Sequence, residues 1–335
     1  MFTLRNSKLS DLDDIYLLSK EANLLNLPSN KAKLLKLLTK SNKSFKSPDI
    51  NLENNYYLFS LEDNKNKRIV GVSAIHGKHG THAKPHYYLK VGKEVKESSS
   101  LKTKIVNHTL KLGIEPNGFT EIGGLILSPP YRGNPSKLGK QLSMVRFLYI
   151  IQFSNLFTKQ IHSELLPPFD ENGKSLLWEG LGRKFLNMDY WEADILSQSD
   201  KNFIHDLFPS STIYQNLLPK NSLQVIGEVG TNTLPVKKML ESIGFKYMNE
   251  VDPFDGGPHF RANLKDLKPF KEFKRIKGSQ IIEKLKINPN VIYIYDISNQ
   301  SNDVDVFFSA ASANYNDSDS INQIDINEIY KGFFI

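Results

Sequence analysis

The chain has 335 residues, of which 39% are hydrophobic and 24% are charged, as in ordinary globular proteins with a full hydrophobic core. It contains no cysteine, which excludes disulfides, cysteine–zinc sites and thiol catalysis. The net charge of +7 fits an anionic small ligand such as a nucleotide cofactor, or nucleic acid. Because no nucleic-acid-binding module is visible, we expect no nucleic-acid partner.

The sequence shows no pattern typical of a transmembrane helix or of a secretory signal. No segment approaches the ~18 uninterrupted apolar residues of a transmembrane helix. The segment Met1–Asn6 has no basic leader followed by an apolar run, as a secretory signal would. We therefore expect a cytoplasmic protein with no membrane partner.

The N-terminal region predicts a strand at Thr3–Arg5, a helix over Asp11–Lys20 and a second helix over residues 30–46. In the second helix, leucines line one side and lysines the other. A helix lying on a membrane surface has this pattern, and so does an ordinary helix packed on a core, which we favour. Aromatic and β-branched residues in Tyr56–Leu61 and Arg68–Ile75 then predict an antiparallel hairpin.

Four histidines follow within eleven residues, at His76, His79, His82 and His86. Clustered histidines can bind zinc or nickel. No acidic ligand lies among these four, however, and the residues between them are typical of a loop. The pattern therefore predicts no metal site.

A strand-to-helix junction is the most informative feature. Phe119–Leu127 predicts a strand that contains Glu121, and an apolar helix is expected over Leu142–Phe157. Unpaired amides and the helix dipole at such a junction bind a pyrophosphate, although a solvated basic turn would have a similar sequence. No Gly-Lys-Ser/Thr follows, which distinguishes the junction from a Walker loop. The candidate cofactor-binding residues are the backbone of Leu125 to Leu127, with Arg132, Gly133, Gly139 and Lys140.

The rest of the chain alternates strands and helices. A strand around Ile161–Leu165 contains Glu164, and Asp255 is expected to cap the turn at Gly256-Gly257 rather than to touch substrate. Beyond about residue 268 the composition shifts, so we expect two domains, residues 1–265 and a small β-rich C-terminal extension, 266–335. Further predicted elements are a helix at Trp178–Phe185, a strand or helix start at Leu223–Val229, a helix at Val236–Ile243 ending on Gly244, and strands at Val291–Tyr295 and Val304–Phe308, followed by a polar turn.

Long collinear segments resemble the bacterial arginine N-succinyltransferases and cover most of residues 1–265. These segments are Glu121–Arg132, Ser143–Phe147, Glu164–Asp194, Ile213-Tyr214, Val225–Val229, Gly244–Tyr247 and Val251–Pro258. The order of the elements is that of the GNAT acyltransferase fold, an α+β fold whose mixed, largely antiparallel sheet is flanked by helices. The resemblance implies this fold for the chain.

The resemblance also implies a reaction. A succinyl group would pass from succinyl-CoA to the α-amino group of arginine, the opening step of arginine degradation. The acyl-CoA would be a co-substrate, no cofactor would be bound permanently, and the chain would form a homo- or hetero-oligomer. Glu121 and Glu164 are candidates for amine recognition or base catalysis, and Tyr214 or His162 for proton donation.

Three departures from the family pattern affect this expectation. Gly230 stands where the family has a histidine that donates a proton. Leu165-Leu166-Pro167 replaces Met-Arg-Gly, and an arginine there would suit the succinyl carboxylate. The pyrophosphate loop is longer, with Lys137 at a glycine position. Three alternatives follow: an acyltransferase with another proton donor, a changed acyl donor or amine, or a non-catalytic subunit.

Overall fold

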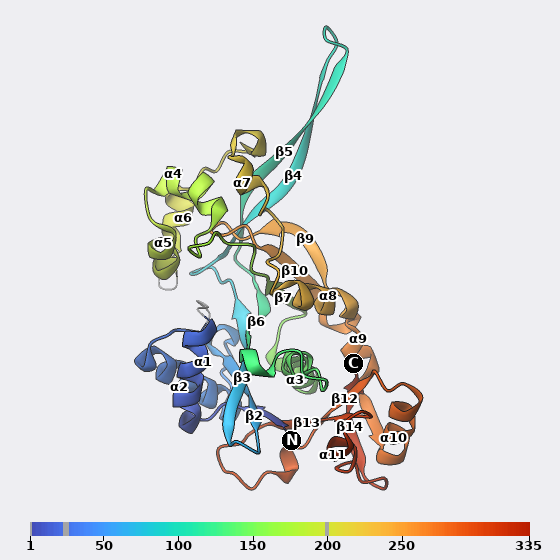
Figure 1. Ribbon diagram of the computed structural model, residues 1–335. Helices are drawn as coiled ribbons and strands as arrows, with labels where there is room; N and C mark the ends of the chain where they lie inside the picture. The colour runs from blue at the N-terminus through green and yellow to red at the C-terminus, as the bar shows by residue number, and fades with distance from the viewer. Residues whose placement is uncertain (1, 23–26, 198–200) are drawn as a thin grey trace. The chain divides into compact units, whose positions relative to one another are not determined.

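The computed structural model describes residues 2–22, 27–197 and 201–335. They form two compact units. The first unit contains the described residues up to Lys78, together with Thr120–Ile161 and Asn263–Ile335. The second unit contains His79–Phe119 and His162–Ala262. Each unit is therefore assembled from segments far apart in the sequence (Figure 1).

The first unit is built on a sheet with the strand order β11-β14-β12-β13-β1-β2-β3-β6. The pairs β1–β2, β2–β3 and β1–β13 are antiparallel, which confirms the hairpin predicted from the aromatic and β-branched runs. The strands are β1 (Phe2–Asn6), β2 (Tyr56–Asp63), β3 (Arg68–His79), β6 (Phe119–Leu127), β11 (Lys274–Lys277), β12 (Ile292–Asp296), β13 (Ser309–Asn314) and β14 (Ile329–Phe334).

Helices pack on this sheet through apolar side chains, and α3 is buried almost all round. In α2, Leu34 and Leu38 are completely buried against residues such as Ile15 and Val72, which confirms the ordinary amphipathic helix. Among the described residues, no helix is long and apolar enough to cross a membrane. The helices of the first unit are α1 (Leu12–Ala22), α2 (Lys31–Lys46), α3 (Leu138–Gln152), α9 (Lys268–Glu272), α10 (Gly278–Ile287) and α11 (Ser318–Ile321).

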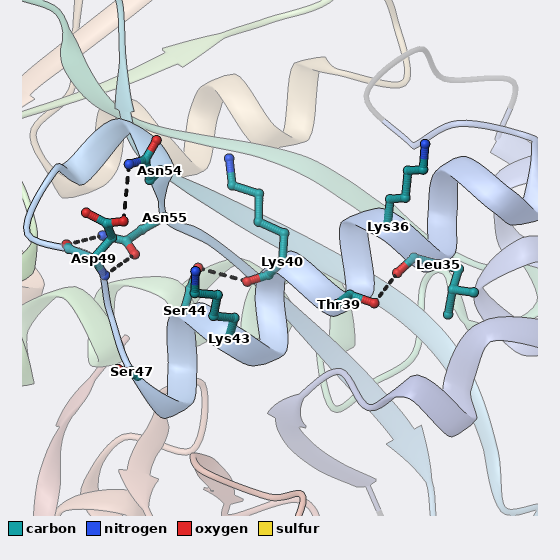
Figure 2. A pocket seen from close by; sticks show the side chains of 10 residues that line it. All are labelled: Leu35, Lys36, Thr39, Lys40, Lys43, Ser44, Ser47, Asp49, Asn54 and Asn55. Carbon is teal, nitrogen blue, oxygen red and sulfur yellow. Dashed lines mark hydrogen bonds between the residues drawn. The ribbon is translucent and has the colours of Figure 1, made fainter.

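The polar side of α2 borders a groove of about 570 Å³. Figure 2 shows its lysines along the helix and the Asp49–Asn54 and Asp49–Asn55 hydrogen bonds at one end. Leu35, Lys36, Thr39, Lys40, Lys43, Ser44, Ser47, Asp49, Asn54 and Asn55 line it. None of them belongs to the predicted pyrophosphate cradle.

The second unit has the strand order β7-β10-β9-β4-β5-β8. Strands β4 and β5 pair along their whole length, from His86↔Glu115 to Ser98↔Thr103, and form a long ribbon (Figure 1). The strands are β4 (His86–Ser98), β5 (Thr103–Glu115), β7 (Gln160–Glu164), β8 (Ile213–Tyr214), β9 (Lys246–Val251) and β10 (Pro258–Asn263). The helical elements are a π-helix (Trp178–Gly182), α4 (Arg183–Leu186), α5 (Tyr190–Ser197), α6 (Asn202–Leu207), α7 (Lys220–Leu223) and α8 (Leu234–Ile243).

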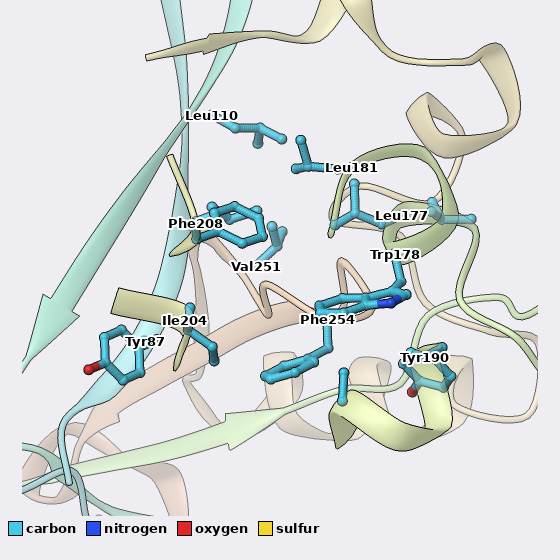
Figure 3. Close-up of a cluster of buried hydrophobic side chains, with 13 residues drawn as sticks. Tyr87, Leu110, Leu177, Trp178, Leu181, Tyr190, Ile204, Phe208, Val251 and Phe254 are labelled. Atoms are coloured by element: carbon cyan, nitrogen blue, oxygen red, sulfur yellow. The ribbon is translucent and has the colours of Figure 1, made fainter. Parts of the chain in front are cut away.

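An aromatic core joins the helices of the second unit to its strands (Figure 3). Trp178 stacks on Phe254, with ring centroids 5.2 Å apart, and its indole N–H donates to the Met188 carbonyl at 3.0 Å. The Ser175 hydroxyl donates to the Phe254 carbonyl at 2.8 Å. These contacts fix the turn between β9 and β10, which contains Asp252 and Asp255.

The C-terminal region differs from the sequence-based expectation. The units do not follow a division at residue 265, because β13 pairs with β1 (Leu4↔Ala310) and so completes the sheet of the first unit. Val304–Phe308 is a turn region, and the strand is Ser309–Asn314. The small residues of this strand have little β propensity, but pairing on both sides between β1 and β12 overrides that preference.

Two other elements also differ. The apolar helix begins at Leu138 and ends at Gln152, with a short 3₁₀ turn after it. Leu223–Val229 is the end of α7 and a turn, because Gly227 adopts a positive φ of 75° and donates its N–H to the Gly256 carbonyl at 2.9 Å. In contrast, α8 ends on Gly244 in the left-handed conformation, as predicted.

Candidate functional site

Strand β6 is distorted at Gly123-Gly124 in the first unit. Gly124 has a φ of +56°, and a Cβ there would lie 3.3 Å from the Cβ of Ala74. A positive φ interrupts regular strand geometry and favours glycine. The residue after the distortion is Leu125, whose backbone is a predicted cofactor contact.

A buried arginine holds this distortion. Arg146 of α3 is 2% exposed, and its guanidinium donates to the Gly123 carbonyl at 3.1 Å. Further hydrogen bonds reach the Ser143 carbonyl at 3.0 Å and the Ser143 hydroxyl at 2.6 Å. Burial lowers the pKa of Arg146 to about 9. The segment Ser143–Phe147 carried part of the family resemblance, but its spacing alone did not indicate this anchoring role.

The predicted pyrophosphate cradle follows β6 directly. The exposed Arg132 donates from Nε to the Leu127 carbonyl at 3.0 Å, which fixes the guanidinium beside the strand end. Gly133 has a φ of +70°, and a Cβ there would meet nothing within 4 Å. These residues therefore form an open turn with a cation beside it.

Helix α3 completes the cradle. Lys137 precedes it in the left-handed conformation, with a φ of 53°, and the Lys140 amide donates to the Lys137 carbonyl at 2.9 Å. Burial lowers the pKa of Lys140, and the charges of Lys137 and Lys268 act in the same direction. A Cβ on Gly139 would lie 3.7 Å from the Leu127 side chain. The predicted cofactor residues thus lie together in the first unit, at the N-terminus of a helix, where anions bind favourably.

Glu121 lies in the same strand, before the distortion, and is 9% exposed. Burial, and then the Glu121 charge, raise the pKa of Tyr56. A nearly buried carboxylate two residues before a strand distortion is the type of group that binds or deprotonates a polar ligand.

Glu164 lies in the second unit, among three histidines. His162 and Glu164 are alternate residues of β7, so their side chains point to the same face of the sheet. His86 begins β4, and His259 lies on β10. The three imidazole rings are mutually 5.0 Å apart by their centroids. The Glu164 side chain is 31% exposed, whereas the histidines are almost completely buried.

One carboxylate oxygen faces all three rings. The distances from Glu164 Oε1 are 3.3 Å to His162 Nε2, 3.5 Å to His86 Nδ1 and 3.9 Å to His259 Nε2. Burial, which by itself would raise the pKa of Glu164, is outweighed chiefly by the hydrogen bond that His162 donates, so this pKa lies below its ordinary value.

An arginine fixes the tautomer of His162. Arg261 Nε donates to His162 Nδ1 at 3.3 Å, and its guanidinium also pairs with Glu250. Arginine can only donate, so Nε2 of His162 carries the ring proton and donates it to Glu164. Burial lowers the pKa of His86 well below its ordinary value and that of His259 to about 3. Both of these imidazoles are therefore neutral at physiological pH.

The remaining sequence candidates have separate surroundings. The Asp255 carboxylate accepts from the Gly257 amide at 2.7 Å, which is the capping role expected. Tyr214 lies on β8 and donates its hydroxyl to Glu94. Among the described residues, the partners of Glu164 are His86, His162 and His259, and none of them lies on β8. The structure therefore does not bring these two candidates together.

Comparisons with known proteins decide the family. The family model described as arginine N-succinyltransferase beta subunit matches residues 2–269. An arginine N-succinyltransferase of Yersinia pseudotuberculosis is 33% identical over 296 residues, which is 87% of this chain and 83% of the relative. The chain belongs to the arginine N-succinyltransferase family.

Other members of this family are similar over comparable lengths. The arginine N-succinyltransferase of an Escherichia coli strain is 30% identical over 283 residues, 84% of this chain and 81% of that protein. A solved structure, arginine/ornithine succinyltransferase subunit AI from Pseudomonas aeruginosa, has a TM-score of 0.77 at 21% identity and covers 100% of this chain and 98% of that one. This likeness confirms the predicted α+β acyltransferase fold.

Two departures from the arginine N-succinyltransferase pattern are neighbours in the second unit. The Gly230 amide donates to the Leu166 carbonyl at 2.9 Å. A Cβ on Gly230 would lie 3.0 Å from the Pro167 carbonyl oxygen. Gly230, which replaces the family histidine, therefore contacts Leu166, which replaces the family arginine. Pro167 restricts the space for a side chain at residue 230.

Proposed function

We propose that this chain is an acyl-CoA-dependent N-acyltransferase that transfers a succinyl group to the α-amino group of arginine. The observation that carries the proposal is the family match over residues 2–269. The junction between β6 and α3 supports it independently, because it combines a helix N-terminus, an open glycine turn and Arg132 held beside the strand end.

The residues divide into three roles in this proposal. Arg132 and Lys140 bind the CoA pyrophosphate at the N-terminus of α3, with Gly133 and Gly139 allowing close approach. The amide of Leu125, presented by the distortion that Arg146 holds, donates to the oxyanion of the tetrahedral intermediate. Glu121 acts as the base that accepts the proton of the amine.

Loss of the family histidine at Gly230 is compatible with turnover. A thiol has an ordinary pKa of about 8.5, so the CoA thiolate is a good leaving group. A missing general acid costs roughly 10²–10⁴-fold in rate, which lowers turnover without abolishing it.

The direct test measures release of free CoA thiol with succinyl-CoA and arginine, alongside acetyl-CoA and a panel of other amines. Release that requires both succinyl-CoA and arginine supports the proposal. The adjacent departures at Gly230 and Leu166-Pro167 favour a second candidate, an acyltransferase with another acyl donor or amine, which would release thiol only with a different pair. CoA binding without release for any pair would indicate a non-catalytic subunit.

Substitutions at Gly230 test the proton donor. We expect Gly230→His to exceed Gly230→Ala in turnover, because both add a Cβ that crowds Pro167 and only histidine supplies an acid. The alanine variant therefore controls for the crowding. Equal rates would mean that residue 230 does not take part in proton transfer in this chain.

We also propose that the chain assembles with further subunits, as the family description of a beta subunit suggests. The β4–β5 ribbon exposes apolar side chains, among them Val95, Leu101 and Ile105, and exposed apolar patches are typical of interfaces. Light scattering coupled to size exclusion would give the assembled mass, and a strictly monomeric mass would contradict this part.

A further inference from the structure

Three buried histidine nitrogens in the second unit lack partners. Within the described part of the chain, Nε2 of His86 and both ring nitrogens of His259 make no hydrogen bond. His86 is 1% exposed and His259 is not exposed at all. Leaving a buried polar atom unsatisfied costs about 1–3 kcal/mol, and folded proteins rarely tolerate several in one place. Some missing group must therefore face these imidazoles.

The surrounding atoms identify the chemistry of that group. His86, His162, Glu164 and His259 each offer one possible ligand atom, and these four atoms all lie within 4.8 Å of one another. In a tetrahedral zinc site with bonds of about 2.0–2.1 Å, ligand atoms are about 3.4 Å apart. The distances from Glu164 Oε1, 3.5 Å to His86 Nδ1 and 3.9 Å to His259 Nε2, are close to that value.

Neutral imidazole nitrogens beside a carboxylate suit a first-row divalent ion. His259 Nε2 makes no hydrogen bond within the described part of the chain, and Nδ1 of His86 lies 3.5 Å from Glu164 Oε1, so these two nitrogens are the candidate ligand atoms. His162 is already committed, because it accepts from Arg261 and donates to Glu164. It is therefore a positioning residue that orients the carboxylate, as outer partners of metal ligands do.

We propose that His86, His259 and Glu164 bind one zinc-like divalent ion, with His162 and Arg261 orienting Glu164. Two histidines and one glutamate leave a fourth coordination position open. The partial exposure of Glu164, 31% of its side chain, gives the ion a route from solvent. His86 belongs to the histidine run for which the sequence predicted no metal; the missing acidic ligand comes from β7. The proposal does not rest on the acyltransferase function.

The test uses metal as the probe and requires no turnover. The full-length chain, without a histidine tag and freed of metal by chelator dialysis, is titrated with Co²⁺ and followed by its visible absorption, and Zn²⁺ is then added as a competitor. We expect saturation at one equivalent and displacement by Zn²⁺. Absence of saturable binding would overturn the proposal and would leave ordered water as the partner of the orphaned nitrogens.

Variants locate the site. His259→Leu should bind at least tenfold more weakly and lose the rise in melting temperature that Zn²⁺ gives the parent chain. Without metal, it should melt no lower than the parent chain, because two unsatisfied nitrogens are removed. His205→Leu is the matched control: His205 is an exposed residue of α6 in the same unit, and its loss should change neither result.

A second variant keeps the proposal testable if His259→Leu does not fold. Glu164→Gln keeps the size of the side chain but removes its charge, and it should also bind Co²⁺ at least tenfold more weakly while melting near the parent chain. Undiminished one-equivalent binding in the folded Glu164→Gln variant would place the ion elsewhere and overturn the proposal, whether or not His259→Leu folds.

Discussion

Replacing Gly124 by alanine tests whether the distortion of β6 exists and matters. Alanine at a φ of +56° is strained by about 1–2 kcal/mol. The new Cβ would also lie 3.3 Å from that of Ala74, so one of the two must shift. We therefore expect a loss of about 1–2 kcal/mol in the free energy of unfolding, or slightly more.

Gly133→Ala is the matched control for this substitution. Gly133 has a φ of +70° but faces open space, so alanine there experiences the backbone strain without the contact. Urea unfolding should be followed by far-UV circular dichroism, because Trp178 and Trp191 both lie in the second unit and would not report directly on β6.

The two variants should also differ in function. Gly124→Ala moves the backbone next to Leu125 and should lower the rate of thiol release, whereas Gly133→Ala should mainly weaken CoA binding. If Gly124→Ala proved as stable and as active as the parent chain, β6 would be regular at this position, and the oxyanion role of the Leu125 amide would have to be abandoned.

Three further substitutions have separate expectations. Arg132→Glu should weaken CoA binding, measured by calorimetry, at least about tenfold, since charge-assisted bonds contribute about 1.5–3 kcal/mol. Unchanged affinity would contradict the assignment of this junction as the pyrophosphate site. Tyr214→Phe should release thiol at a rate within about twofold of the parent chain, because the Tyr214 hydroxyl is hydrogen-bonded to Glu94. A fall near the 10²-fold typical of a general acid would instead identify Tyr214 as the proton donor. Burial raises the pKa of Asp252 to about 7, above its unfolded value of about 3.9, so this carboxyl favours folding below the unfolded value and loses that contribution as the pH rises towards 7. Melting of Asp252→Asn across this range should therefore depend less on pH than melting of the parent chain, and identical pH profiles would contradict the raised pKa of this carboxyl.

Features determined by neighbouring residues were predictable from the sequence. The junction from β6 into α3 was found because strand, glycines and cations follow one another along the chain. The capping role of Asp255 was found for the same reason, since its partner amide is only two residues away. Local order of this kind leaves a direct signal in a single sequence.

Features assembled from distant segments were not predictable. The histidine cluster draws on β4, β7 and β10, and only the alternation of His162 with Glu164 hinted that they share a face. The sequence indicated only that Arg146 lies in an apolar helix, whereas in the structure its guanidinium donates to the Gly123 carbonyl of another element, β6. Strand β13 was missed because its small residues become a strand only between β1 and β12.

The most direct test of the central claim is mass spectrometry of the product formed from succinyl-CoA and arginine, compared with arginine whose α-amino group is blocked. The account predicts one succinyl group on the α-amino nitrogen of arginine, equimolar release of CoA thiol, and no product from the blocked compound. Succinylation of the blocked compound, or product only with another acyl-CoA or amine, would contradict it.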